Sequence, residues 1–277
     1  MSGEPAREVR NLTLLVSHDR SGSHYLGSYI RSLPGQTMID EICNEQALDP
    51  ATNPLSFFGY RHRRSLEMPD YSLRRTPKVV SALLDEYFQF VLDSSSTSRA
   101  AMDIKYGHIH NFEAAWWPIF RRPFLFDYAR GRGLKVIHLS RWNSLETVVS
   151  NMVAESRKVW HAIGKKGAAA PSDAITLDKQ HLSRQIALLN EQKNAIFKWS
   201  RDLKCLSVLY EELVDPTHGR ACRTRIAEFL ESSPPEKFSS PYRKVTPPIQ
   251  LMIRNWDEIS NFCRESGLSQ YLLGTPR

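Results

Sequence analysis

Short apolar runs alternate with longer amphipathic stretches along the chain. Five runs rich in apolar and β-branched residues have the length of strands, and they cover residues 12–17, 37–42, 101–105, 134–139 and 205–209, with the weakest pattern in 37–42. Apolar residues recur at helical spacing in the stretches 27–33, 79–92, 145–160, 182–199, 223–230 and 249–263. Strands that alternate with helices of this length predict an α/β fold with a mainly parallel central sheet and helices on both faces.

Length and composition narrow the architecture of the protein. With 277 residues, 41% of them hydrophobic and 24% charged, the chain has the composition of an ordinary globular protein, and we expect one domain over residues 1–277. The four cysteines form no CxxC pair, which argues against a zinc site and a disulfide framework. No apolar run is long enough for a transmembrane segment and the N-terminus is polar, so we expect a soluble, cytoplasmic protein. A net charge of +7 suits an anionic cofactor, an acidic substrate or a nucleic acid.

The stretch HDRSGSHYL, residues 18–26, lies between the first predicted strand and a helical pattern. A strand, a tight turn and a helix N-terminus together direct backbone N–H groups at an anion. The turn differs from the Walker A pattern GxxxxGK[ST], because it holds only Gly22 and its cation, Arg20, precedes that glycine. It therefore suits one phosphate or phosphosulfate and lacks the usual residues for a magnesium triphosphate.

Two later motifs complete a pattern known from one enzyme family. The segment VIHLSR at 136–141 ends in Arg141, and Ser150 follows nine residues later on a predicted helix. The segment VLYEEL at 208–213 closes another predicted strand. In this order, the three motifs resemble the sulfotransferases that use 3'-phosphoadenosine 5'-phosphosulfate (PAPS). The phrases DEICNE and VIHLSRWN are most similar to the bacterial branch that includes nodulation-factor and related glycan or glycolipid sulfotransferases.

The resemblance implies a single P-loop-like domain and a set of cofactor contacts. The resemblance implies that the 5'-phosphosulfate loop consists of Arg20, Ser21, Gly22, Ser23 and His24, and that Tyr25 stacks on adenine. It implies that Arg141 and Ser150 bind the 3'-phosphate. It also implies that Arg243 and Lys244 belong to a cationic loop that closes over this phosphate. His24 stands where a threonine is more usual in the family. The segment 208–213 is expected to tie down a nearby loop through a carboxylate or a ring. The product of the donor is adenosine 3',5'-bisphosphate (PAP).

The chemistry of sulfuryl transfer explains why the site needs a cation and a general base. The bridging oxygen of the leaving group gains negative charge in a loose, in-line transition state, so a fixed cation near it lowers the barrier, and we expect Arg20 in that role. The acceptor hydroxyl must lose its proton to a general base. In the resembling bacterial branch a glutamate serves, which indicates Glu41 first and Glu45 second. Histidine is the base in other branches, and His110 and His161 stay open as alternatives.

The predicted function is therefore transfer of a sulfuryl group from PAPS to a hydroxyl of a glycan, a glycolipid or another small acceptor, without a metal. Two alternatives stay open: a kinase, which would need magnesium and carboxylates to bind it, and a basic nucleic-acid binding module. The basic stretch 61–75 lacks the glycines and stacking aromatics that favour nucleic acid. The connections 59–78 and 164–172 are candidate lids, and a homo-oligomer is compatible with the sequence.

Overall fold

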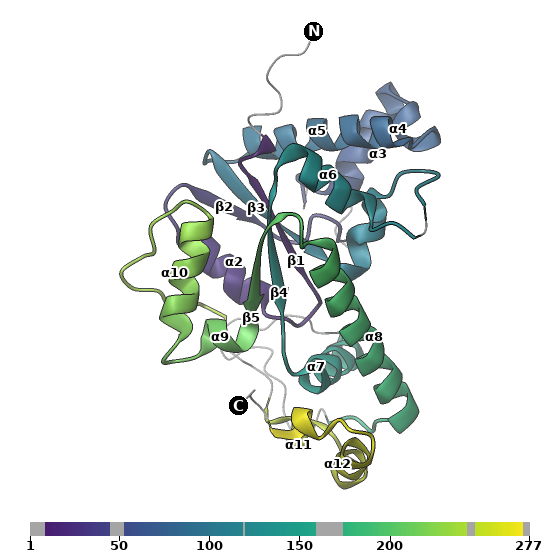
Figure 1. Ribbon diagram of the computed structural model, residues 1–277, viewed down its shortest axis with the longest axis vertical. Helices are drawn as coiled ribbons and strands as arrows, with labels where there is room; N and C mark the ends of the chain where they lie inside the picture. The colour runs from purple at the N-terminus through teal and green to yellow at the C-terminus, as the bar shows by residue number, and fades with distance from the viewer. Residues whose placement is uncertain (1–8, 45–52, 119, 159–173, 243–246, 274–277) are drawn as a thin grey trace.

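Five parallel strands form the centre of the protein. The computed structural model describes residues 9–44, 53–118, 120–158, 174–242 and 247–273. Within them the sheet has the order β2-β3-β1-β4-β5 (Figure 1). The strands are β1 (Leu12–Ser17), β2 (Gln36–Ile39), β3 (Arg99–Lys105), β4 (Lys135–Ser140) and β5 (Lys204–Leu209). Each predicted strand overlaps one of these, and the prediction of an α/β fold with a mainly parallel sheet is confirmed.

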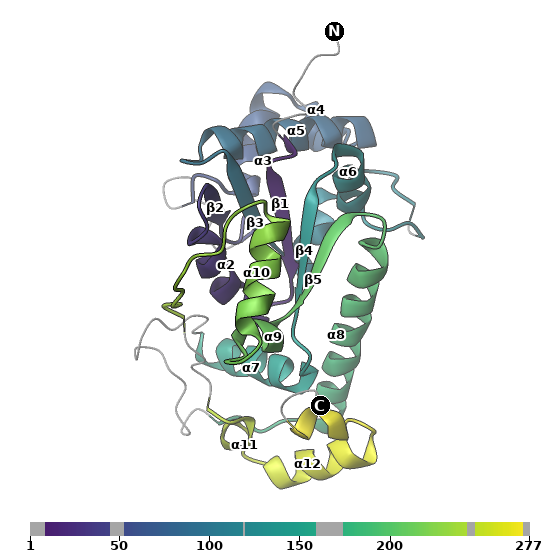
Figure 2. The ribbon, with the colours of Figure 1, turned by 60° about the vertical axis from the view of Figure 1, so that its left-hand side comes forward.

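The two faces of the sheet are buried by different helices (Figures 1 and 2). Along β1, Leu14 and Val16 belong to the larger core cluster whereas Leu15 belongs to the smaller one, as the alternation of a strand requires. The smaller cluster includes residues of α2 (Ser23–Arg31) and α10 (Gly219–Phe229). The larger cluster includes residues of α3 (Phe57–Glu67), α5 (Pro77–Asp93), α6 (Phe124–Arg132), α7 (Ser144–Arg157), α8 (Lys179–Trp199) and α12 (Trp256–Glu265). Helices on both faces are thus confirmed.

Short helical elements complete the described structure. They are α4 (Asp70–Leu73), α9 (Tyr210–Val214), α11 (Ile249–Met252) and the 3-10 helices η1 (Tyr106–Phe112) and η3 (Ser269–Leu273). Among the described residues, no helix combines the length and the apolar character that crossing a bilayer requires.

The region 59–78, expected as an irregular connection, is largely helical, which corrects that expectation, while its role as a lid stays a prediction. It contains most of α3, all of α4 and the start of α5. The hydroxyl of Ser56 accepts a hydrogen bond from the Gly59 N–H at 3.4 Å and caps α3. Only Phe57 and Tyr60 of α3 are buried, both near its N-terminus. The remaining turns therefore carry no apolar stripe from which a helix could be predicted.

The helix predicted for 249–263 is divided into α11 and α12. Between them Ile253 is extended and pairs with Ile175. The Ile175 N–H donates to the Met252 carbonyl at 3.0 Å, and the Arg254 N–H donates to the Ile175 carbonyl at 2.9 Å. These bonds use backbone groups that a continuous helix would need for itself, which is why the helical pattern does not form one helix.

Candidate functional site

The loop between β1 and α2 has the geometry of an anion cradle. Its residues Arg20 and Gly22 both have left-handed backbones, with φ of 62° and 89°. A Cβ atom added to Gly22 would lie 2.2 Å from Cδ2 of Tyr210, so only glycine fits there. Helix α2 begins at Ser23 and has no acidic residue in its first turn. Its positive N-terminal end is therefore available to an anion at the loop.

The first and second predicted motifs meet in one hydrogen bond. The Nε atom of Arg20 donates to Oγ of Ser150 at 3.1 Å, across 130 residues of sequence. Ser150 is buried on α7. Burial lowers the pKa of Arg20 from its usual value, and the nearby positive charge of Arg141 lowers it further. The structure thus brings together the three predicted residues Arg20, Arg141 and Ser150.

Arg141 follows β4 directly and is almost completely buried. Its guanidinium forms an ion pair with Glu146 and lies 3.7 Å from Oε1 of Glu211. The guanidinium carbon also lies 5.3 Å from the centre of the Tyr210 ring. Two carboxylates and an aromatic face therefore hold this cation at the carboxyl edge of the sheet.

The segment 208–213 contacts both predicted phosphate motifs. The carboxylate of Glu211 accepts hydrogen bonds from the N–H groups of Trp142 at 2.9 Å and Asn143 at 3.3 Å. The ring of Tyr210 lies between Gly22 and Arg141, since it contacts both. The prediction that a carboxylate or a ring of this segment ties down a nearby loop is confirmed.

Glu41 lies beside the loop, just after β2. Its Oε1 atom is 3.7 Å from Nε2 of His24, and its Oε2 atom accepts a hydrogen bond from the side-chain amide of Asn44 at 3.0 Å. The backbone of Glu41 is left-handed, with φ of 41°. Both Glu41 and His24 keep about a fifth of their side-chain surface exposed, at 22% and 23%. The first predicted base is therefore close to the predicted phosphosulfate loop and accessible from solvent.

A segment from the last third of the chain covers the start of α2. The ring of Phe238 contacts Tyr25 edge to face, with centroids 5.7 Å apart. The ring of Tyr242 lies 5.4 Å from that of His24, and Oγ of Ser240 is 2.8 Å from Oγ of Ser28. The predicted loop residues are thus in contact with the chain that leads to the predicted cationic pair.

Several predicted residues lie outside the described residues or away from the loop. Glu45, His161, Arg243 and Lys244 lie outside the described residues, as does the candidate lid 164–172. The helix predicted for 145–160 ends at Arg157. His110 is exposed in η1, and no contact among the described residues joins it to the loop 18–23.

Lys105 is a site residue that the sequence analysis missed. It ends β3 with only 3% of its surface exposed, and its Nζ atom donates to Ser23 Oγ at 2.6 Å and to Asp103 Oδ2 at 2.6 Å. Burial alone would lower the pKa of Lys105, but the charge and hydrogen bond of Asp103 raise it above its usual value. The signal in the sequence was an aspartate and a lysine in the otherwise apolar run 101–105.

A second group of buried polar residues, which the sequence analysis also did not identify, lies near the backbone of Arg141. Lys193 of α8 donates to the backbone carbonyl of Arg141 and to Oγ of Ser144, and burial lowers its pKa to about 8. His138 of β4 shares a 2.6 Å hydrogen bond with the hydroxyl of Tyr106. Burial lowers the pKa of His138 to about 4, assisted by the charge of Lys193. His138 is therefore neutral at physiological pH.

Comparison with known proteins identifies the family that this site resembles. Residues 122–241 match the family model described as Stf0 sulphotransferase. Over this range the chain matches a sulfotransferase family. The Stf0 match includes Arg141, Ser150 and the segment 208–213, and it begins after Arg20 and Glu41. The predicted resemblance to sulfotransferases is confirmed, the bacterial branch fits the Stf0 name, and sulfotransferase activity in general is supported. No curated protein matches the chain.

Proposed function

We propose that this protein transfers the sulfuryl group of PAPS to a hydroxyl of an acceptor, which is a glycan, a glycolipid or another small molecule. The Stf0 match supports sulfotransferase activity. The observation that carries the proposal is the hydrogen bond between Arg20 and Ser150, because it joins the loop after β1 to the helix after Arg141. Ligands of open parallel sheets bind beyond the carboxyl ends of the strands, where these residues lie.

The donor atoms of the loop fit a phosphosulfate group. Oγ of Ser21 is buried and has no hydrogen-bond partner among the residues that the structure describes. A buried hydroxyl without a partner is unfavourable, and an anionic oxygen would satisfy it. Together with the guanidinium of Arg20 and the backbone N–H groups of residues 21–24, this hydroxyl supplies donors of the kind that bind phosphate and sulfate oxygens.

The 3'-phosphate of the donor is assigned to Arg141 and Ser150. Arg141 is already held by Glu211 and by the Tyr210 ring, so its guanidinium needs little ordering when an anion binds. We expect the phosphate to displace Glu146 from this cation. Arg243 and Lys244 are assigned to the same phosphate because they directly follow Tyr242, whose ring contacts His24. Tyr25 is assigned to adenine.

Arg20 stabilises the negative charge on the leaving group, and Glu41 accepts the proton of the acceptor hydroxyl. Arg20 donates a hydrogen bond to the bridging oxygen, which gains charge as its bond to sulfur breaks and PAP leaves. The acceptor oxygen forms the new bond to sulfur, and Glu41 takes up the proton that this oxygen loses. Asn44 holds the carboxylate of Glu41 through its side-chain amide. The position of Glu41 beside the loop favours it over His110, which makes no described contact there.

Calorimetric titration with PAP tests the donor site. We expect the wild-type protein to bind PAP without a metal, and Arg20→Ala or Arg141→Ala to weaken binding by about 1.5–3 kcal/mol, as for loss of a hydrogen bond to a charged group. Arg220→Ala is the matched control, because Arg220 is exposed on α10. Absence of PAP binding, or a preference for magnesium ATP, would contradict the proposal.

Replacement of Glu41 separates the chemical step from donor binding. Glu41→Gln should lower turnover by roughly a hundredfold to ten-thousandfold, the usual contribution of a general base, while PAP affinity stays unchanged. Asp40→Asn is the control, since the Asp40 carboxylate forms an ion pair with Arg31. A Glu41→Gln enzyme with wild-type turnover would exclude Glu41 as the base, and Glu45→Gln and His161→Gln then become the variants to measure.

A further inference from the structure

The loop after η1 and the helices α3 and α4 expose large apolar side chains. Trp116 and Phe120 of the loop are 97% and 96% exposed. Leu66 of α3 and Leu73 of α4 are 73% and 80% exposed. Large apolar side chains gathered at one place on a surface mark a site that binds a partner, whereas isolated ones need no explanation.

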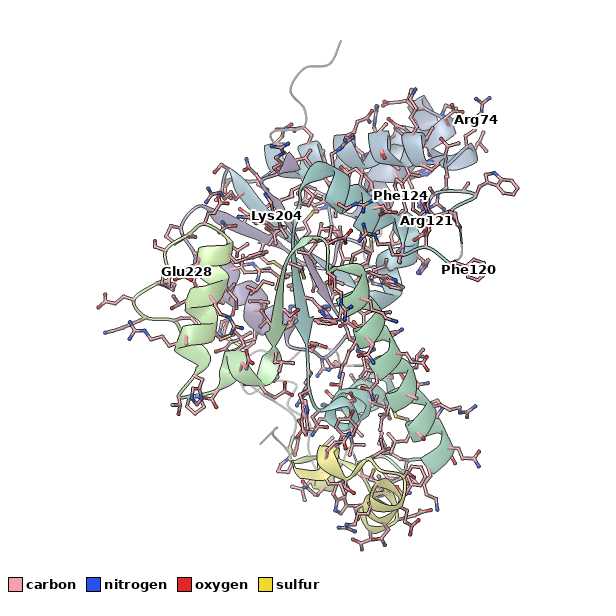
Figure 3. The ribbon with its side chains drawn as sticks, viewed as in Figure 1. Arg74, Phe120, Arg121, Phe124, Lys204 and Glu228 are labelled. Carbon is pink, nitrogen blue, oxygen red and sulfur yellow. The ribbon has the colours of Figure 1, made fainter. Side chains whose placement is uncertain are left out.

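The two segments that carry these side chains are bonded to each other. The Ala115 N–H donates to the Arg75 carbonyl at 2.5 Å, so the residue before Trp116 is bonded to the residue after Arg74. The guanidinium of Arg75 also donates to the Glu113 carbonyl at 2.6 Å. In Figure 3, Arg74, Phe120 and Arg121 project from the same side of the molecule, away from Lys204 and Glu228. We define the apolar–basic surface by its residues Leu66, Leu73, Arg74, Trp116, Phe120 and Arg121.

The charge around these side chains is strongly positive. Residues 61–78 contain six lysines and arginines against two carboxylates. Arg74 and Arg121 are exposed; Arg74 forms an exposed ion pair with Asp70 at 3.4 Å, and the Arg121 guanidinium lies over the Trp117 ring. An isologous contact between two copies would bring these arginines close to one another, which disfavours a second copy as the occupant.

We propose that the apolar–basic surface binds an anionic phospholipid membrane. Tryptophan and phenylalanine side chains insert at the boundary between headgroups and acyl chains, and arginines beside them attract the lipid phosphates. Phe120, Arg74 and Arg121 present both features on the same side of the molecule. The inference concerns attachment to a lipid surface and does not depend on the reaction that the protein catalyses.

Vesicle co-sedimentation of the full chain tests this assignment. We expect binding to vesicles of phosphatidylglycerol mixed with phosphatidylcholine, and much weaker binding to phosphatidylcholine alone. Trp116→Ser/Phe120→Ser should weaken binding about tenfold, because the apolar area available for insertion is lost. Arg74→Gln/Arg121→Gln should lose about fivefold per charge, and the loss should shrink as salt screens the lipid charge.

Matched variants on α8 control for nonspecific effects. Phe197 is half-exposed and carries Arg201 over its ring, as Trp117 carries Arg121, so Phe197→Ser and Arg201→Gln should leave vesicle binding unchanged. Lys204→Gln serves as a further charge control. All replaced side chains are exposed, and thermal melting and PAP titration of each variant check that the fold and the donor site are intact.

Three results would overturn the assignment. The first is a wild-type protein that binds anionic vesicles no better than neutral ones. The second is a Trp116→Ser/Phe120→Ser variant that binds as tightly as the wild type. The third is a dimer in sedimentation velocity that this variant dissociates, since the surface would then join two copies. Because PAP titration is measured on the same samples, a failure here remains distinguishable from a failure of the proposed sulfotransferase function.

Discussion

Replacing Gly22 by alanine tests whether the loop and the Tyr210 ring are in contact. Two terms add at this position. A left-handed backbone costs an alanine roughly 1–2 kcal/mol, and Gly22 has φ of 89°. The new Cβ atom would also lie 2.2 Å from Cδ2 of Tyr210, and overpacking of this kind typically costs about 1–3 kcal/mol. We therefore expect Gly22→Ala to lower the free energy of unfolding by about 2–5 kcal/mol.

Gly35 offers a control that separates the two terms. It also has a left-handed backbone, with φ of 71°, but no atom lies within 4 Å of a Cβ added there. Gly35→Ala should therefore show the backbone term alone, and the difference between the two variants measures the contact with Tyr210. Urea unfolding gives both free energies, and PAP titration should show a loss of about tenfold or more only in Gly22→Ala, because the loop must move.

A double variant makes the test specific to this pair. In Gly22→Ala/Tyr210→Ala the ring is gone, so the double variant should be more stable than the sum of the single changes predicts. Equal stabilities of Gly22→Ala and Gly35→Ala, with unchanged PAP affinity in both, would refute the contact and the arrangement of the site built on it.

Three further predictions concern titratable side chains in and around the candidate site. Lys105→Met should destabilise the fold by about 3–5 kcal/mol in urea unfolding, since it leaves Asp103 buried without its cation, and Asp103→Asn/Lys105→Met should recover part of the loss. In the folded protein the pKa of His138 is about 4, whereas in the unfolded chain it is the ordinary 6.5. Between pH 6.5 and 4 the unfolded chain therefore binds a proton at His138 that the folded protein does not bind, and lowering the pH reduces the free energy of unfolding by up to about 3 kcal/mol. His138→Gln should remove that part of the pH dependence of unfolding. Glu146→Gln should strengthen PAP binding in calorimetry by about tenfold or less, because the competing ion pair with Arg141 is lost; weaker binding would mean that Glu146 holds Arg141 in place.

Local patterns of apolar residues were sufficient to predict those strands and helices whose buried faces show a regular hydrophobic period. The strands were predictable because buried parallel strands are short, continuous apolar runs, such as 12–17 and 134–139. The two predicted phosphate motifs could be located in the sequence because each occupies one turn at a strand end, and their order is readable along the chain; their phosphate contacts stay predictions. Whether residues 1–277 form one domain, and whether the protein forms a homo-oligomer, stay predictions.

What the sequence analysis missed depends on contacts between distant segments. Lys105 acquires its position only when β3 lies beside β1, which brings it to Ser23 over 82 residues. The division of the helix 249–263 depends on Ile175, which lies far away in the chain. Helix α3 was missed for a different reason: its polar turns face solvent, and a helix that buries only two side chains leaves almost no periodic signal.

The placement of Arg20 and Arg141 at one edge of the sheet does not by itself favour folding. Burial and the mutual repulsion of the two cations disfavour the charged state of Arg20, yet the adjacent strands β1 and β4 bring both to the same sheet edge. Two carboxylates, Glu146 and Glu211, hold Arg141 there. Apolar side chains of similar size would stabilise the fold as well or better. A bound anion contacting both cations would replace their repulsion with two attractions, which supports the proposed anion site at this edge.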